Sequence, residues 1–538
     1  MKNESLLDPV FAGTAFRRLA IAHSAAITEK AGNRVILRID ASVLRQIAFE
    51  AFHDVNFFFR TTHLEAWARI LSDPDASDND RFVVAALLKN AAISAEGILP
   101  SCQDTGTATI IGLKGEGVST DADDEEALSR GAAEAYATCN LRFSQVAPIS
   151  MLDDADTRTN LPAQVDLHAV PSNGPGGGEY RLLFIAKGGG SANKTSFFQE
   201  TRALLKEDAL DAFLRDRVRA LGTAGCPPYH LCVVIGGSSP EQNLTMLKLA
   251  TAGALDLLPT APPAPFRDPA WEARLLAHAR ESRLGAQFGG ACLALDARVI
   301  RLARHAASLP ISIGVSCSAH RNALARIGVD GVWLEDFDRA PGRFLPRAID
   351  VLSRASAAAR RIDLGQPLAS VRAQLAGCRL GALVLLSGPL IVARDAAHAR
   401  LAALLAQGLP LPDWFLRHPV YYAGPAATPP GRVIGSFGPT TAQRMDPYVR
   451  SFMAAGASLV MLAKGNRSPG VVDACRDYGG FSLGTIGGAA ALIAQENIVA
   501  EELVAWPELG MEAVRRIEVK DLPAFICIDD KGGNLYKA

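Results

Sequence analysis

The feature that most constrains the fold is a pair of apolar runs that each end in a glycine-rich loop. Residues 181–186 (RLLFIA) lead into KGGG, and residues 231–235 (LCVVI) lead into GGSS. Apolar runs of this length that stop at glycine are typical of buried β-strands. A strand that ends at glycines leaves backbone N–H groups uncovered, because no side chain shields them. The pattern therefore predicts strands whose ends a ligand can reach.

Amphipathic stretches alternate with these apolar runs and predict helices. Residues 84–98 form one predicted helix, which leads into a loop that carries Cys102, and residues 126–139 form another. The acidic run at 121–126 (DADDEE) is typical of a first helical turn, where carboxylates face the positive end of the helix dipole. Alternating helices and strands of this kind indicate the α/β fold class.

The composition of residues 340–377 predicts a division into two domains. This stretch is rich in alanine and arginine with interspersed proline and glycine, and a new apolar run follows at Leu380. Further along, the segments 458–462 and 489–492 indicate a second, smaller α/β unit. We therefore predict a larger N-terminal domain at 1–350, a connector at 351–376 and a smaller C-terminal α/β domain at 377–538.

Charge and hydropathy exclude several classes of protein. The formal net charge of the 538 residues is -1, which gives no electrostatic footprint for nucleic acid or for an anionic membrane surface. The first residues lack the basic and then apolar pattern of a signal peptide. The most apolar window, 380–393, is shorter than the roughly 20 residues of a membrane span and contains Gly388 and Pro389. We therefore expect a cytoplasmic protein with neither a nucleic-acid nor a membrane partner.

The cysteines are better explained as thiols or metal ligands than as disulfides. Nine cysteines are an odd number in a long chain without an export signal, and no two form a Cys-x-x-Cys pair. Cys102, Cys226 and Cys317 lie in loops bounded by glycine or proline, at LPSCQDTGT, AGCPPYH and GVSCSAH. In the first of these loops Gln103 and Asp104 follow the cysteine directly, so a metal ligand there stands beside acid–base groups.

Two further motifs combine glycine with cationic or hydroxyl side chains. KGGGSANKT at 187–195 nearly matches the phosphate-binding pattern G-x-x-x-x-G-K-S/T, but Asn193 replaces its second glycine. In GSFGPTTAQRMD at 435–446, a threonine after Gly-Pro can start a helix, which predicts that Thr440 and Arg444 point together from one face. Guanidinium and ammonium groups of this kind bind anions, and the further basic candidates are Arg142, Arg394 and Lys464.

Together, the three cysteine loops, KGGGSANK and GPTTAQRMD resemble segments of class I fumarases, the iron–sulfur-dependent fumarate hydratases. The resemblance implies that Cys102, Cys226 and Cys317 bind three irons of a [4Fe-4S] cluster in the N-terminal domain. The fourth iron then stays open as a Lewis acid. His320 is a local departure, since an acidic residue is expected at this position after Cys317.

The resemblance also implies a reaction and the residues that perform it. The expected activity is the reversible hydration of fumarate to L-malate, which is the reaction of a hydro-lyase of the tricarboxylic acid cycle. The protein is expected to be a homodimer. Asp104 is expected as the acid near the leaving hydroxyl and Thr440 as the base at the adjacent carbon. The substrate-binding residues that the resemblance implies are Gln103, Arg142, Gly189, His305, Arg394, Arg444 and Lys464. Two alternatives stay open: a related tartrate or mesaconate hydratase, and a non-catalytic iron–sulfur sensor.

Overall fold

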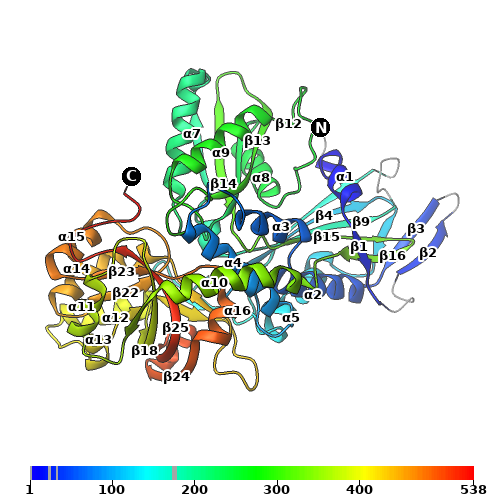
Figure 1. Ribbon diagram of the computed structural model, residues 1–538. Coiled ribbons are helices and arrows are strands. Elements are labelled where there is room, and N and C mark those ends of the chain that lie inside the picture. The colour runs from blue at the N-terminus through cyan, green and yellow to red at the C-terminus, as the bar shows by residue number, and fades with distance from the viewer. Residues whose placement is uncertain (1–2, 22–25, 32–33, 172–177, 538) are drawn as a thin grey trace.

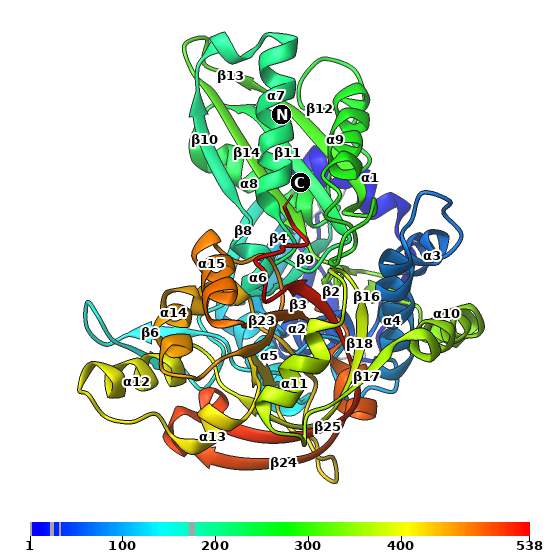
Figure 2. The same cartoon turned by 60° about the vertical axis from the view of Figure 1, so that its left-hand side comes forward.

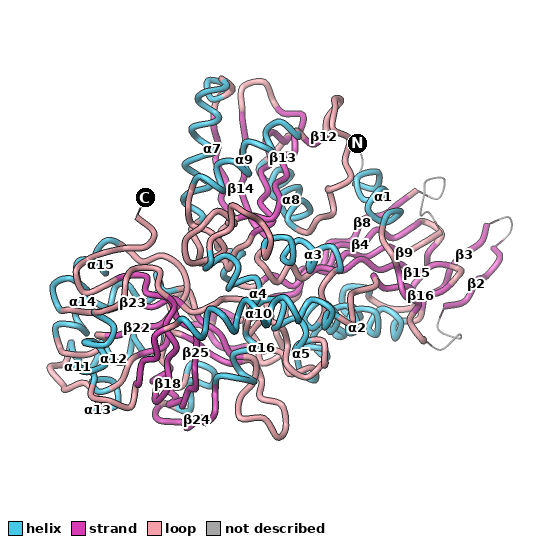
Figure 3. The backbone as a smooth tube through the Cα atoms, in the orientation of Figure 1, coloured by secondary structure: helices cyan, strands magenta, loops and turns pink. Residues whose placement is uncertain are grey.

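Three β-sheets organise the protein, whose structure is a computed structural model described for residues 3–21, 26–31, 34–171 and 178–537. Figure 1 shows one sheet at the right, one at the top and one at the lower left, each with its own helices. Figure 3 separates the same three groups of strands and shows helices and loops between them. The α/β fold class predicted from the sequence is confirmed.

The first sheet has six strands in the order β1-β16-β15-β9-β4-β8. Its strands are β1 (Phe16–Arg18), β4 (Thr107–Gly115), β8 (Gln164–Val170), β9 (Tyr180–Lys187), β15 (Asn322–Gly328) and β16 (Gly331–Glu335). α2 (Ala41–Phe57) and α5 (Asp124–Thr138) pack on one face, and α1 (Asn3–Gly13) packs on the other. Because both faces are covered, β9 is buried along nearly its whole length and reads as a continuous apolar run.

The second sheet has five strands in the order β10-β14-β11-β13-β12. Its strands are β10 (Ser196–Glu200), β11 (Tyr229–Gly237), β12 (Phe266–Arg267), β13 (Ala294–Arg304) and β14 (Leu309–Ser316). α7 (Glu207–Leu221) and α9 (Pro269–Glu281) share a core with one face, whereas α8 (Pro240–Thr251) packs between this sheet and the first. Figure 2 shows this unit standing above the rest of the molecule.

The third sheet belongs to the C-terminal part of the chain and has seven strands in the order β17-β18-β19-β22-β23-β25-β24. Its strands are β17 (Arg360–Asp363), β18 (Leu383–Val392), β19 (Val420–Tyr421), β22 (Val460–Ala463), β23 (Phe481–Gly484), β24 (Ile498–Ala505) and β25 (Val514–Ile528). An additional pairing of β18 with β25 closes five of these strands into a ring. Around the sheet lie α11 (Leu368–Ala376), α12 (Asp395–Ala406), α13 (Asp413–Arg417), α14 (Asp446–Ala454), α15 (Pro469–Tyr478) and α16 (Ala490–Leu492).

Smaller elements complete the described part of the chain. Short pairings involve β2 (Ala26–Ala31), β3 (Arg34–Ile39), β5 (Val118–Thr120), β6 (Val146–Pro148), β7 (Asp154–Asp156), β20 (Ala423–Pro425) and β21 (Phe437–Pro439). The remaining helices are α3 (Thr61–Ile70), α4 (Asp78–Ser94), α6 (Gly189–Ala192) and α10 (Leu345–Ala358). The 3₁₀ helices are η2 (Arg202–Leu204), η3 (Pro341–Phe344), η4 (Ala442–Met445) and η6 (Pro507–Glu512), and η5 (Ile493–Asn497) is a π-helix.

Helix α4 connects the two parts of the chain. Its buried residues share one hydrophobic core with strands of the seven-stranded sheet, and α10 packs against it. The stretch 351–376, which we expected to be a connector, contains the end of α10, the edge strand β17 and α11. The domain division at 350 and 377 stays a proposal.

Several elements predicted from the sequence lie close to those observed. The helix expected at 126–139 is α5, with Asp123 as its cap and acidic residues in its first turn. The strands expected at 181–186 and 231–235 lie within β9 and β11. The helix expected at 84–98 is α4, which begins earlier because Ser77 and Asp80 form a capping box. Across the described ranges, each helix is too short or too polar to cross a membrane.

Candidate active site

A cavity of about 290 Å³ lies where loops from both parts of the chain meet. Its walls come from the loop before β4, the loop after β9, the segment after β21 and the residue after β22. Of the residues singled out in the sequence, the cavity brings together Gln103, Asp104, Arg142, Gly189, Arg394, Thr440, Arg444 and Lys464. Because most of these residues are far apart in the chain, the site forms only when the two parts are packed together.

Asp104 and Arg142 lie side by side because their backbones are tied together. The Thr105 hydroxyl accepts a hydrogen bond from the Arg142 N–H (2.9 Å) and donates one to the Arg142 carbonyl (3.1 Å). The Arg142 guanidinium then lies 3.4 Å from the Asp104 carboxylate. On the other side, a Cβ on Gly188 would stand 2.8 Å from Asp104 Oδ2. The KGGG loop can therefore approach the carboxylate only because this position has no side chain.

Cations around Asp104 favour its ionised form. Burial acts to raise the pKa of Asp104, but Arg142, Arg321 and Lys464 act to lower it, as does the N–H of Gly189. The net result is a pKa below the usual 3.8. Asp104 is therefore a carboxylate at neutral pH, ready to accept a proton.

Thr440 and Lys464 are neighbours because their backbone segments pair. The Lys464 N–H donates to the Thr440 carbonyl (3.1 Å), and the Ala442 N–H donates to the Lys464 carbonyl (2.9 Å). Both side chains are buried, with 8% and 6% exposed. The chain then continues through η4 into α14, which places Arg444 on the wall of the same cavity. A hydroxyl, an ammonium and a guanidinium thus face one space.

Arg394 is the most buried guanidinium of the cavity and is incompletely paired. It stands at the start of α12, 7% exposed, with its Nη2 3.1 Å from Glu512. Its Nε has no hydrogen-bond partner among the described residues. Burial lowers the pKa of Arg394 from 12.5 to about 10, and repulsion from Arg142 and Arg444 adds to the shift. The three guanidinium groups therefore act on one another, and an anion between them would relieve the repulsion.

The three singled-out cysteines lie together behind this cavity. Cys102 and Cys226 are buried, Cys317 is half-buried, and the thiols are close enough for their charges to act on one another. The Ser318 N–H donates to the Cys226 carbonyl (2.9 Å), which joins two of the cysteine loops. Among the described residues, no three or more His, Cys, Asp and Glu side chains are arranged to hold a single metal ion.

Lys464 connects the cysteines with the cavity. Its Nζ donates a hydrogen bond to Cys226 Sγ (2.9 Å) while the same side chain lines the cavity. Burial raises the pKa of Cys226 to about 11, as do the neighbouring cysteines, and Lys464 acts in the opposite direction. Cys226 itself has a left-handed backbone, with φ +62°, which L-residues other than glycine adopt at a cost in free energy. The position of this thiol is therefore imposed by its surroundings.

Sequence reasoning missed one cation of the site. Arg321 is 5% exposed, donates to Asn56 Oδ1 (3.0 Å) and acts on the charges of Cys102 and Asp104. The signal in the sequence was slight, because Arg321 is a lone basic residue beside a motif already noted for its cysteine. Lys187, the first residue of the KGGG motif, borders the cavity, but its ammonium donates to the Thr251 hydroxyl (3.3 Å).

His305 lies outside the cavity of its own chain. It is exposed in the connection between β13 and β14, and β14 leads from there to Cys317. The eight residues of β14 span roughly 25 Å at about 3.3 Å per residue, so the histidine and the cysteine lie at opposite ends of this strand. A spacing of twelve residues in the sequence therefore does not bring His305 near the cysteines.

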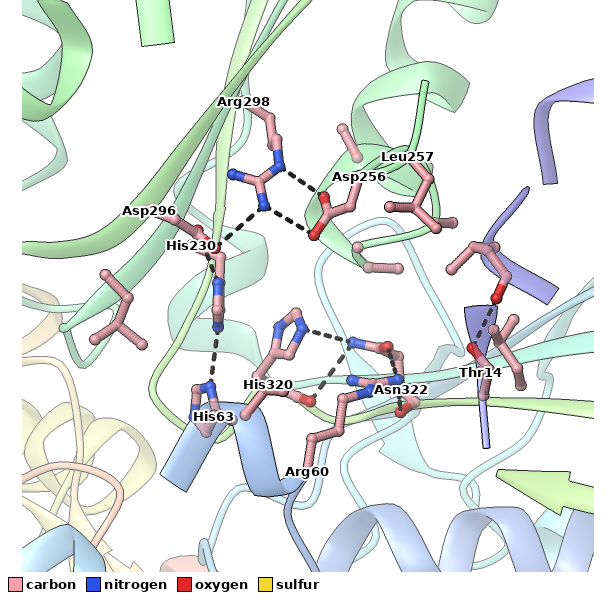
Figure 4. A pocket seen from close by; sticks show the side chains of 18 of the residues that line it. Thr14, Arg60, His63, His230, Asp256, Leu257, Asp296, Arg298, His320 and Asn322 are labelled. Atoms are coloured by element: carbon pink, nitrogen blue, oxygen red, sulfur yellow. Dashed lines mark hydrogen bonds and ion pairs between the residues drawn. The ribbon is translucent and has the colours of Figure 1, made fainter. Parts of the chain in front are cut away.

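His320, the local departure noted in the sequence, belongs to a group of three histidines in a second cavity of about 490 Å³. Figure 4 shows Asp296, His230 and His63 in a hydrogen-bonded row, with separations of 2.8 and 3.0 Å, and His320 beside them. His63 continues the row to the Ser318 carbonyl (2.8 Å). Burial lowers the pKa of His63 to about 3 and that of His320 well below 6.5, so both are neutral. This cavity shares no lining residue with the first.

Comparison with known proteins agrees with these observations. Residues 45–326 match the family model described as "Fumarate hydratase (Fumerase)", and residues 331–538 match "Fumarase C-terminus". The chain is 50% identical to "Fumarate hydratase 2" of Leishmania major over 506 residues, covering 94% of this chain and 88% of the relative.

Two relatives from Escherichia coli strain K12 show the same degree of similarity. They are "Fumarate hydratase class I, anaerobic" and "Fumarate hydratase class I, aerobic". Each is 50% identical over 505 residues, covering 93% of this chain and 91% of the relative. The resemblance seen in the cysteine, KGGG and GPTT segments is thus confirmed over most of the length, and the chain belongs to the class I fumarase family of hydro-lyases.

Proposed function

We propose that this chain catalyses the reversible hydration of fumarate to L-malate. The observation that carries the proposal is the excess of positive charge in the 290 Å³ cavity. Asp104 is the one acidic side chain among the described residues that line it, whereas the cationic side chains of Arg142, Arg394, Arg444 and Lys464 line it as well. A four-carbon dicarboxylate brings two negative charges to such a cavity, and guanidinium groups bind carboxylates through two hydrogen bonds. The fumarate hydratases to which the chain is 50% identical support the same substrate.

The arrangement of the cations suits a substrate with a carboxylate at each end. Arg394 and Arg444 act on one another's charge on the C-terminal wall. Lys464 lies at the end nearest the cysteines, in contact with Cys226. We infer that the two arginines bind one carboxylate, and that Lys464, with Gln103 beside Cys102, lies nearer the other.

Asp104 and Thr440 are the proposed proton-transfer groups. In hydration, the ionised Asp104 accepts a proton from the attacking water and the Thr440 hydroxyl supplies one to the adjacent carbon. In dehydration both roles reverse, so Asp104 is the acid at the leaving hydroxyl and Thr440 is the base. A threonine alkoxide is unfavourable by itself, and the nearby charges of Arg444 and Lys464 stabilise it.

The three cysteines fit an iron–sulfur cluster. Their thiols lie near one another, and Arg321 and Lys464 offset the negative charge that thiolates would carry. In a [4Fe-4S] cluster each thiolate binds a different iron, so the sulfurs need not converge on one point. With Cys102, Cys226 and Cys317 as its ligands, the cluster would supply one open iron as a Lewis acid for the hydroxyl and a carboxylate.

We further propose that His305 acts in a homodimer. The resemblance implies that it contacts substrate, yet it is exposed at the far end of β14 from the cysteines of its own chain. Both expectations hold together if His305 of one chain reaches the cavity of the other. A two-fold dimer contains two such contacts, because each chain then gives and receives the same residue.

Anaerobic turnover tests the proposal. The substrates are fumarate, L-malate, tartrate and mesaconate, with iron and sulfide quantified in the same sample. Fumarate–malate interconversion that scales with cluster content supports it. Faster turnover of tartrate or mesaconate would assign the chain to a related hydratase, and a loaded cluster without any turnover would make it a sensor.

A matched pair of variants tests the chemistry of the site. Thr440→Val removes the cavity hydroxyl and is expected to abolish turnover with the iron content unchanged. Thr138→Val removes an exposed hydroxyl on α5 that bonds only the Glu134 carbonyl and Cys139, and it should leave activity intact.

The proposal also includes a cytoplasmic location and a place in the tricarboxylic acid cycle. Cell fractionation tests the location, and growth on malate or fumarate tests the place in the cycle.

A further inference from the structure

Gln287 is a buried residue with a strained backbone in the loop between α9 and β13. It is 2% exposed, and its φ is +121°, a conformation that residues other than glycine rarely adopt. The loop around it is fixed by Asp80, whose carboxylate accepts hydrogen bonds from the N–H groups of Ala286 (2.6 Å) and Ala291 (2.9 Å). Backbone strain of this kind persists only where the surroundings impose it, and it is concentrated at functional sites.

The side-chain amide of Gln287 holds two separate loops. Its Nε2 donates to the carbonyls of Pro227 (3.0 Å) and Gly487 (2.9 Å), and its Oε1 accepts from the Gly487 N–H (2.8 Å). Pro227 is the residue after Cys226. Gly487 lies directly over the Cys226 thiol, because a Cβ on this glycine would collide with Cys226 Sγ. The amide therefore joins the two backbone segments that enclose this one cysteine.

A tyrosine of the C-terminal segment also forms a hydrogen bond with Gln287. The Tyr536 hydroxyl donates to the Gln287 carbonyl (2.8 Å). Figure 2 shows this segment rising from β25 toward the five-stranded sheet, to which Tyr536 also packs. Both polar ends of Gln287, backbone and side chain, are thus bonded in the same buried region.

We propose that Gln287 is a positioning residue that fixes the Cys226 thiol, with Tyr536 as its support. It contacts no part of the 290 Å³ cavity, so its effect on the reaction passes through the cysteine. The inference rests on the proposed function only in taking Cys226 as a cluster ligand. Hydrogen-bonding partners behind a metal ligand commonly change metal affinity by about 10- to 100-fold, because they hold the ligand in its binding geometry.

Two variants and one control test the proposal. Gln287→Met keeps the length of the side chain and removes all three amide hydrogen bonds. Tyr536→Phe leaves these three bonds in place and removes the bond to the Gln287 carbonyl, together with a contact to Cys527 Sγ (3.6 Å). Asn243→Leu is the control, since Asn243 is also buried and its amide donates to three carbonyls, those of Val234, Gly236 and Pro310. Val234 and Gly236 lie in the half of β11 away from Cys226, and Pro310 lies beside them in β14.

The first measurement is the rate at which reconstituted protein loses iron to a chromogenic chelator without oxygen. Gln287→Met is expected to lose iron about tenfold faster than wild type or more, Tyr536→Phe a few-fold faster, and Asn243→Leu at the wild-type rate. Equal rates in folded wild type and Gln287→Met would overturn the proposal.

The second measurement uses the iron-free chain and maps alkylation of each cysteine by mass spectrometry. Gln287→Met is expected to change the alkylation rate of Cys226 several-fold more than those of Cys102 and Cys317. A general loosening would change all three alike and would overturn the positioning role. If the wild type bound no cluster, the proposed function would fail, yet this alkylation pattern would still decide the role of Gln287.

Discussion

Replacing Arg394 with methionine is expected to remove most activity without lowering the free energy of unfolding. Burial and two neighbouring guanidinium groups lower the pKa of Arg394 from 12.5 to about 10. The unfolded chain therefore binds this proton more tightly than the folded chain, so the charge opposes folding at every pH below about 10. This pKa difference corresponds to roughly 3 kcal/mol. Methionine removes the charge at similar volume, which offsets the loss of the ion pair with Glu512 (3.1 Å).

The same substitution is expected to lower activity, although it does not lower the free energy of unfolding. A hydrogen bond between a guanidinium and a carboxylate contributes about 1.5–3 kcal/mol. Loss of one such bond from the transition state lowers kcat/KM by roughly 10- to 150-fold. Steady-state hydration of fumarate measures this loss, and urea denaturation of the same sample measures stability.

Arg467 supplies the matched control. It is also 7% exposed, but its pKa is raised, because Tyr422 and Asp446 act against burial, and its Nε lies 2.6 Å from Asp446. Arg467→Met removes the charged partner of Asp446, whose side chain is 9% exposed and keeps the hydrogen bond from the Ser468 N–H (2.6 Å). Loss of one partner of a buried ion pair destabilises by about 3–5 kcal/mol. If Arg394→Met lowered stability as much as Arg467→Met and kept kcat/KM within about twofold, the charge argument would be wrong.

Other predictions concern ligands, assembly and pH. Cys317→Ala is expected to lose iron and activity together, whereas Thr440→Ala keeps iron and does not turn over. Iron analysis beside turnover compares them, and an active Thr440→Ala protein would exclude the threonine. Mixing His305→Ala with Thr440→Ala chains should restore about a quarter of wild-type activity, because half of the dimers then hold one intact site. No recovery would argue against His305 acting across the dimer. Arg142 lowers the pKa of Asp104, so Arg142→Gln should raise that pKa. The pH below which hydration activity is lost should therefore be higher in Arg142→Gln than in wild type, and an unchanged acid limb of the pH profile would contradict this.

The sequence predicted the loops of the site better than their contacts. Glycine-rich strand ends and the Gly-Pro-Thr segment indicated where backbone would be open, and Gly189 and Thr440 do line one cavity. Both signals are local, since glycine after an apolar run predicts its own surroundings. The pairing of Thr440 with Lys464 joins the segments that follow β21 and β22, which meet only in the folded protein, so the spacing in the sequence does not reveal it.

Residues that act through long-range contacts could not be recognised from the sequence. Gln287 is a lone polar residue between glycines, and its three hydrogen bonds reach segments 60 and 200 positions away. Arg321 looks like an ordinary surface arginine until its burial is known. His305 shows the reverse relation, because two residues that are close along the chain lie far apart when a strand separates them.

The contacts between the two parts of the chain explain why glycine recurs in the C-terminal motifs. A Cβ on Gly438 would collide with the amide of Gln103, next to the first cysteine, and one on Gly487 would collide with the Cys226 thiol. A Cβ on Gly488 would stand 2.6 Å from the Ser318 hydroxyl, next to the third cysteine. All three cysteine loops are thus covered by C-terminal backbone at distances that no side chain permits. The C-terminal part therefore does more than bind substrate, because it also closes the space in which the thiols lie.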